Sequence, residues 1–121
     1  MKLTQETGSG NLIRSYQHRQ IRINDATYTR SVIVTADQLV TDWAPQTLAE
    51  LTEQHLQPIL DLQPEVVILG TGATQQFPQR AILQRVLRAG IGIEVMATDA
   101  ACRTYNILMA EDRRVAAALF P

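Results

Sequence analysis

The chain has 121 residues, of which 45% are hydrophobic and 19% are charged, and its formal net charge is -1 at pH 7. This length and composition are those of one ordinary globular domain, so we expect a single domain over residues 1–121 and exclude a disordered chain and a membrane-spanning helix. The balanced charge argues against nucleic-acid binding as the main activity, because affinity for the phosphate backbone comes from clustered Lys and Arg.

The single cysteine, Cys102, excludes a disulfide framework and a Cys-rich zinc site. His18 and His55 have no partner at metal-ligand spacing, so we predict no metal site. The first residues, Met1–Glu6, contain neither the apolar stretch of a signal peptide nor the Arg-rich pattern of a transit peptide. We therefore expect a cytoplasmic protein.

Charge is distributed unevenly along the chain. Between Ser31 and Gln79 there are six acidic residues and no Lys or Arg, whereas every basic residue lies before or after this stretch. One interpretation is a pair of complementary surfaces, used between subunits or toward a protein partner, since Arg suits interface ion pairs. The other is two independently solvated faces, which is the favoured interpretation.

The first third of the chain has β-strand patterns. Leu12–Tyr16 and Ile21–Ile23 are short strand candidates, Asn24–Asp25 is a turn pair, and Tyr28–Val34 continues with β-branched residues. These patterns predict an antiparallel hairpin or meander over about residues 11–35. Thr47 and Glu50 then have the spacing of a capping box, and apolar side chains recur at helical spacing as far as Pro64. A helix is therefore predicted after Thr47.

The next segments predict a β-α-β unit. Val66–Leu69 is a continuous apolar run, as expected of a strand in the middle of a sheet covered on both faces. A helix is expected from Pro78 to Gly90, where the glycine can adopt the left-handed conformation, and Ile91–Met96 is the next strand. Such a connection is right-handed, so the two strands are parallel.

The chain ends with one more helix and one more strand. The helix is expected from Thr98 or Asp99 to between Met109 and Glu111. Val115–Phe120 is most simply a final strand, and a short helix is the alternative because alanine dominates this stretch.

The β-α-β topology brings two polar turns to one sheet edge. Gly70, Thr71 and Gly72 follow the first strand, and Thr98 and Asp99 follow the second. Helix N-termini at such an edge favour anions, so these five residues form a candidate crevice for a small anion. The alternative is a purely structural turn. A dinucleotide site is disfavoured, since Gln75 stands where the third glycine of that fingerprint belongs.

Cys102 and Asn106 complete the list of candidate ligand-binding residues. Cys102 lies near the helix start, a position that can lower a thiol pKa, but no base is placed beside it, so a packed cysteine is favoured. Asn106 lies one turn further on, where its carboxamide can cap a strand end or hold a ligand. We predict no catalytic residues.

Several stretches together resemble a known family. They are Glu65–Gly72, Gly90–Thr98, Ala101–Leu108 and Glu111–Leu119. They look like the small α/β domain shared by bacterial and archaeal proteins of unknown function and by the mitochondrial complex I assembly factor 3 proteins. The resemblance implies a three-layer α/β domain with a central mixed sheet and an accessory β-hairpin. For the mitochondrial relatives it implies assembly of the respiratory NADH dehydrogenase, and it supplies no catalytic residues.

Two functional hypotheses follow. The first is a noncatalytic binding or assembly module with a protein partner or a second copy of itself. The alternative is a small-anion or small-molecule binding protein, or a minor enzyme, that uses the crevice at the strand ends. Neither hypothesis involves a cofactor.

Overall fold

The computed structural model describes residues 10–121. An antiparallel sheet near the N-terminus contains β1 (Ile13–Gln17), β2 (Gln20–Ile23) and β3 (Ala26–Tyr28). A five-stranded mixed sheet has the order β5-β4-β8-β6-β7, with strands β4 (Val32–Val34), β5 (Leu39–Val40), β6 (Val66–Gly70), β7 (Gly92–Met96) and β8 (Val115–Leu119). The helices are α1 (Gln57–Asp61), α2 (Arg80–Arg88) and α3 (Thr98–Ala110), preceded by the 3-10 turns η1 (Leu48–Glu50) and η2 (Glu53–Leu56).

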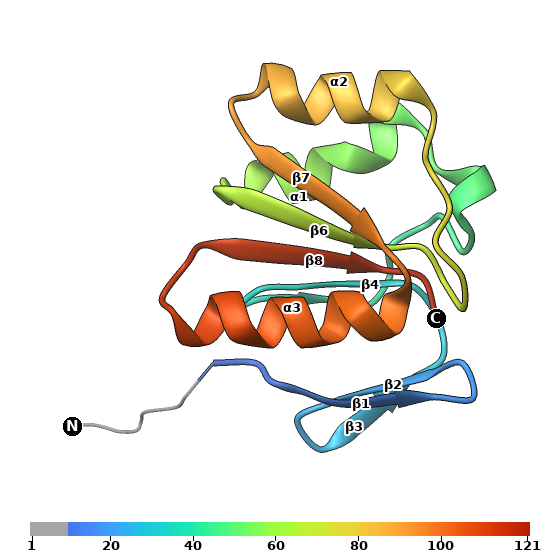
Figure 1. Cartoon of the computed structure of the whole chain (residues 1–121), viewed down its shortest axis with the longest axis vertical. Helices are drawn as coiled ribbons and strands as arrows, with labels where there is room; N and C mark the ends of the chain where they lie inside the picture. Colours follow the sequence, from blue (N-terminus) through green and yellow to red (C-terminus); the bar gives the residue numbers. More distant parts are fainter. Residues whose placement is uncertain (1–9) are drawn as a thin grey trace.

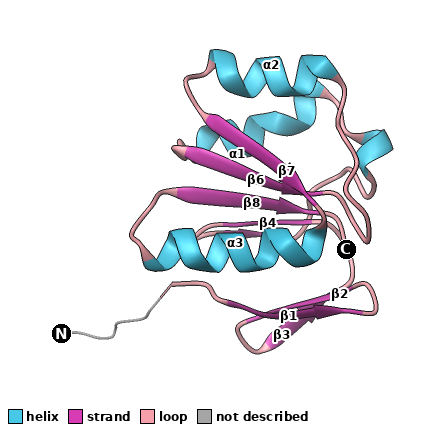
Figure 2. Ribbon diagram, viewed as in Figure 1, coloured by secondary structure: helices cyan, strands magenta, loops and turns pink. Residues whose placement is uncertain are grey.

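The elements form three layers, as Figures 1 and 2 show. Helices α1 and α2 cover one face of the mixed sheet, and α3 together with the three-stranded sheet covers the other. Successive residues of β6 alternate between the two cores: Val66 and Ile68 face α3, whereas Val67 and Leu69 face the α1 and α2 side. The predicted α/β class with a central mixed sheet is confirmed.

The β-α-β unit is also confirmed. Strands β6 and β7 are parallel, with Val66 opposite Gly92 and Gly70 opposite Met96, and α2 connects them. Gly90 has the expected left-handed conformation, with φ +79°.

One position in the sheet differs from the expectation. Strand β8, not β6, is the middle strand, because β8 pairs antiparallel with β4 and parallel with β6. Its alanines fit between the two covered faces of the sheet, and all five of its residues are buried.

The predicted N-terminal hairpin or meander is a three-stranded meander, but it is shorter than expected. The stretch Tyr28–Val34 does not form one strand: β3 ends at Tyr28, and β4 begins at Val32 in the other sheet. Ser31 lies at this crossing and is fully buried, with its Oγ within hydrogen-bond distance of the carbonyl oxygens of Trp43 and Pro45. These contacts fix the point at which the chain passes from one sheet to the other.

The helix predicted after Thr47 was wrong in its extent and in its cap. Thr47 makes no side-chain cap, and the Glu50 carboxylate instead accepts a hydrogen bond from the Gln46 amide at 3.0 Å. The capping box belongs to Thr52 and His55, where the Thr52 amide donates to His55 Nδ1 at 3.0 Å. The chain is extended at Leu51, which is buried in the core, so tertiary packing interrupts the helical pattern there.

Candidate functional site

The predicted crevice residues Gly70, Gly72 and Thr98 meet at one corner of the molecule. The Gly72 amide donates to Thr98 Oγ1 at 2.8 Å, and the Thr98 amide donates to the Gly72 carbonyl oxygen at 2.9 Å. Thr98 Oγ1 donates in turn to the Phe120 carbonyl oxygen at 2.6 Å. The Phe120 amide donates to the Gly70 carbonyl oxygen at 2.9 Å. This network joins the ends of β6 and β8 to the start of α3.

Gly70 lies where α3 comes closest to the sheet. A Cβ atom there would lie 2.9 Å from Leu119 Cδ2 and 3.0 Å from both Ala101 Cβ and Thr98 Oγ1. The glycine therefore allows close packing of the helix start on the sheet. Gly72 has a different role, because its φ of +104° lets the chain turn away from β6.

Thr71 organises the loop from β6 to α2. Its amide donates to the Met96 carbonyl oxygen at 2.9 Å, and its hydroxyl donates to the Thr74 carbonyl oxygen at 2.8 Å. The hydroxyl also accepts a hydrogen bond from the Gln76 amide at 3.0 Å. The Thr71 and Gly72 amides and the two threonine hydroxyls at this corner are thus bonded to the protein itself.

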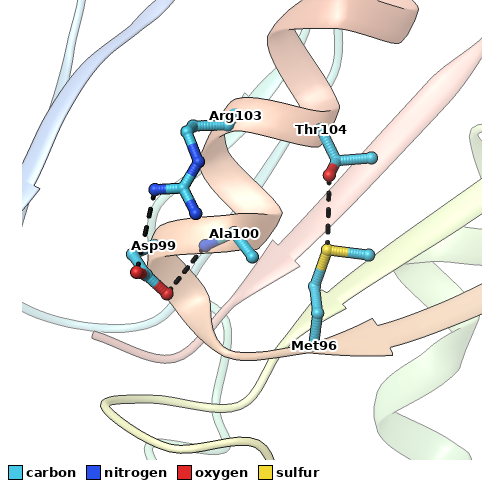
Figure 3. A network of polar contacts seen from close by, with 5 residues as sticks. All are labelled: Met96, Asp99, Ala100, Arg103 and Thr104. Atoms are coloured by element: carbon cyan, nitrogen blue, oxygen red, sulfur yellow. Dashed lines mark hydrogen bonds and ion pairs between the residues drawn. The ribbon is translucent and has the colours of Figure 1, made fainter.

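Asp99 lies at the exposed start of α3, beside this corner (Figure 3). Its carboxylate accepts a hydrogen bond from the Ala100 amide at 2.8 Å and pairs with Arg103 at 3.7 Å. A negative charge in the first turn interacts favourably with the helix dipole. The neighbouring Thr104 Oγ1 lies 3.4 Å from Met96 Sδ, which connects α3 to β7.

Cys102 is a packed residue of the core beneath α3. Its side chain is buried among the strands β1, β6 and β8, and burial raises the pKa of the thiol to about 12. The Asp99 carboxylate adds to this rise, whereas Arg103 opposes it. The helix start therefore does not produce a low thiol pKa, because desolvation of the thiolate outweighs the dipole.

We expect Cys102 to react with a thiol reagent about a thousandfold more slowly in the folded protein than in urea at pH 8, because few thiolates form. Since the folded pKa is raised, the thiol's contribution to stability is complete below its ordinary pKa and is lost as pH rises toward about 12. Ellman's reagent measures the rate. The control is the exposed Ala73→Cys in a Cys102→Ala background, and equal rates at positions 102 and 73 would contradict the packed state.

Asn106 holds the N-terminal strand against α3. Its Oδ1 accepts a hydrogen bond from the Ile13 amide at 3.0 Å, and its Nδ2 donates to the Ile13 carbonyl oxygen at 2.7 Å. The preceding residue, Tyr105, is buried, and its hydroxyl donates to the Asn11 carbonyl oxygen at 2.7 Å. Burial raises the pKa of this tyrosine. The carboxamide thus caps the start of β1, as one of its two sequence interpretations proposed, and Cys102 and Asn106 both face β1 rather than the corner.

A hollow that the sequence analysis missed lies at the opposite end of the strands from the Gly70 corner. Its volume is about 1090 Å³, and it lies at the amino ends of β6 and β8. Charged side chains line it, namely Asp37, Asp61, Asp112, Arg113 and Arg114. No sequence motif indicated it, because the β4–β5 turn, the end of α1 and the end of α3 come together there only in the folded chain.

An ion pair lies at the same end of the strands. Arg113 Nε lies 3.1 Å from Glu65 Oε2, so Arg113 pairs with Glu65 and joins the start of β6 to the turn before β8. The Arg114 amide, which donates to Glu65 Oε1, is the main cause of a lowered Glu65 pKa, and Arg113 contributes as well. Within residues 10–121, Glu111 forms no ion pair with an arginine.

Comparison with known proteins gives the family. Residues 13–120, which include every strand and helix described above, match the model of a family described as a protein of unknown function (DUF498/DUF598). The chain belongs to this family. The resemblance inferred from the sequence is therefore confirmed.

The relatives include both assembly factors and bacterial proteins. The chain is 32% identical over 121 residues to the NADH dehydrogenase [ubiquinone] 1 alpha subcomplex assembly factor 3 of Danio rerio, an alignment that covers 98% of this chain and 69% of that protein. It is 31% identical to a 13 kDa major membrane protein of Francisella tularensis, over 84% of each chain. A crystal structure of a Bordetella parapertussis protein superposes with a TM-score of 0.87 at 37% identity, covering 93% of this chain and 97% of that one. Within residues 10–121 of our chain, no helix is long and apolar enough to cross a membrane.

Proposed function

We propose that this chain is a protein-binding module that acts in the assembly of a multi-subunit complex. The observation that carries the proposal is its alignment, over almost its whole length, with a protein named as a respiratory complex assembly factor. An assembly factor makes contacts with the proteins of the complex that it helps to assemble. The candidate partner is therefore a subunit of such a complex, with a second copy of this chain as the other possibility.

The loop from β6 to α2 offers a surface for such a contact. Phe77 in this loop is 75% exposed, an unusual position for a large aromatic side chain in water. The loop is held in place by Thr71 and by Gln75, whose Nε2 donates to the Val95 carbonyl oxygen of the edge strand at 3.0 Å. A fixed, exposed aromatic is the kind of residue that dominates binding energy at interfaces, because little entropy is lost when it is buried.

The test is site-specific photo-crosslinking in the organism that encodes the chain. A photoreactive phenylalanine at position 77 is expected to give a discrete crosslinked product with one protein, whereas the same group at the exposed control position Thr29 gives none. The mass of the product distinguishes a second copy of the chain from another protein. Identical crosslinking from both positions, or from neither, contradicts a binding surface at Phe77.

The assembly role has a separate test. Deletion of the gene is expected to reduce the amount of intact NADH dehydrogenase complex on a native gel, and the wild-type gene is expected to restore it. An unchanged amount of complex in the deletion strain would contradict a role in assembling this complex, even if position 77 crosslinks to a partner.

A small-anion site at the corner of Gly70, Thr71, Gly72, Thr98 and Asp99 is the alternative proposal. The observation in its favour is that the two turns meet, as the topology predicted. An anion there must displace Thr98 Oγ1 from the Gly72 amide and approach the Asp99 carboxylate. Phosphate titration, followed by amide chemical shifts, is expected to shift Gly72 and Asp99 first if the site exists, and the absence of shifts at millimolar phosphate contradicts it.

A further inference from the structure

The three-stranded sheet turns one face to the core and the other to solvent. Ile13, Ile21 and Ile23 are buried against α3 and β4. Because side chains alternate along a strand, Arg22 lies on the opposite, outer face, where it is exposed. Its register partners are Ser15 on β1 and Thr27 on β3, both also exposed.

An irregularity in β1 places a second arginine on the same outer face. The pairing between β1 and β2 shifts between Ile13 and Ser15, so that Arg14 is an extra residue in this strand. Ile13 and Tyr16 both face inward, the latter opposite the buried Ile21, so the two residues between them, Arg14 and Ser15, both lie outward. The bulge thus brings Arg14 beside Arg22.

Two more arginines stand at the ends of the strands. Arg19 and His18 form the exposed two-residue turn between β1 and β2, both in the left-handed conformation with φ +60° and +53°. Arg30 is exposed where the chain leaves β3 for the other sheet. We call Arg14, Arg19, Arg22 and Arg30 the arginine face. Within the described residues, none of the four forms an ion pair.

Among residues 10–121, few acidic side chains lie near the arginine face. The one acidic residue between positions 10 and 30 is Asp25. Asp99 of α3 comes near Tyr16 at the end of β1, but it is paired with Arg103. The other side of the mixed sheet, by contrast, carries charges of both signs (Figure 1). Glu50, Glu53 and Asp61 lie there in η1, η2 and α1, and α2 contributes Arg80, Arg85 and Arg88. The arginine face is therefore a local excess of positive charge in a chain whose net charge is -1.

We propose that the arginine face is a docking surface for an anionic phospholipid bilayer. The residues on the outer face of the strands are polar or charged, namely Arg14, Ser15, Arg22 and Thr27. Protein interfaces normally contain a buried apolar core, which this face does not offer, whereas attraction to an anionic leaflet needs only basic side chains near the surface. The acidic segments then point away from the lipid.

This inference goes beyond the proposed assembly function, because it concerns where and in which orientation the module works. The face is distinct from Phe77, which lies in the loop from β6 to α2 rather than in the three-stranded sheet. A chain docked in this way holds its arginine face on the membrane while the β6–α2 loop stays available to a protein partner.

The test is co-sedimentation of the full chain with vesicles. We expect binding to vesicles of phosphatidylglycerol and phosphatidylcholine at low ionic strength, and little binding to vesicles of phosphatidylcholine alone. Arg14→Glu/Arg22→Glu is expected to lower the partition coefficient at least about tenfold, because each basic residue contributes separately to the attraction. Added salt is expected to weaken binding in the same way, since it screens exposed charges.

The matched control is Arg80→Glu/Arg88→Glu, which makes the same change in net charge at two exposed positions on α2. Its partition coefficient is expected to change by less than about threefold, because α2 lies on the other side of the mixed sheet. Circular dichroism and the melting temperature check that both variants fold. A variant that unfolds is replaced by the charge-neutral pair Arg14→Gln/Arg22→Gln.

Three results would overturn the proposal. The first is failure of the wild-type chain to bind the anionic vesicles, or equal binding to phosphatidylcholine alone. The second is an equal loss in the α2 control, which would indicate a net-charge effect without a docking face. The third is tighter binding to duplex DNA or to polyglutamate than to the vesicles, abolished by the Arg14 and Arg22 changes, which would assign the face to a nucleic acid or an acidic protein.

Discussion

Ile68→Ala is expected to lower the free energy of unfolding by about 2–5 kcal/mol, the usual range for removing most of a large core aliphatic side chain. Ile68 is fully buried on β6, between β7 and β8, and its side chain packs beneath α3 with Tyr105 and Ala101. Strands fix its surroundings on both sides, so the cavity left by the substitution has little freedom to collapse.

Urea denaturation followed by circular dichroism measures this effect. Ile107→Ala on α3 is the matched control, because it removes the same atoms from a side chain that is 59% exposed, and its cost is expected to be within about 0.5 kcal/mol. If the two variants lose equal stability, β6 is not the packed interior strand described here.

Thr98→Val is the second substitution with a large expected effect, about 2–4 kcal/mol of destabilisation. The change keeps the shape of the side chain but removes the hydroxyl that accepts from the Gly72 amide and donates to the Phe120 carbonyl oxygen. Thr98 is fully buried, so water cannot replace these hydrogen bonds. Two backbone groups are left without partners at the junction of β6, β8 and α3.

Thr98→Ser is the control for this prediction, since it keeps the hydroxyl and removes only a methyl group. It is expected to retain most of the stability that Thr98→Val loses in a thermal or urea melt. Amide hydrogen exchange at Gly72 gives an independent measure, and we expect faster exchange in the valine variant only. Equal stability of the valine and serine variants would show that the hydroxyl does not hold the corner together.

The tight corner at Gly70 could be predicted only in part from the sequence. A glycine between a buried strand and a turn indicates close approach of the backbone, and its place at the end of β6 was correct. The sequence did not show which side chains approach Gly70. The contacts come from Leu119, Ala101 and Thr98, which lie 28 or more residues further along the chain and reach Gly70 only when β8 and α3 pack together.

The roles of Cys102 and Asn106 also depend on contacts with distant segments, which the sequence could not predict. Their shared stripe on α3 follows from helical spacing, and the sequence correctly favoured a packed cysteine. The partner of that stripe could not be inferred, because β1 is about 90 residues away and its docking depends on the Asn106 and Tyr105 hydrogen bonds. Both residues were therefore assigned to the same crevice as Thr98, although they face the N-terminal strand.

Local patterns alone determined the β-α-β unit, the last helix and the last strand, because each depends on periodicity and on end signals within about twenty residues. Local patterns failed at Thr47, where the burial of Leu51 breaks the helix, and at Tyr28–Val34, where the chain changes sheets at Ser31. Tertiary structure alone decided that β8 is the middle strand and that charged residues gather in the hollow at the opposite edge. These features depend on contacts between distant segments, whose energies are set by packing and burial rather than by the preferences of any single segment.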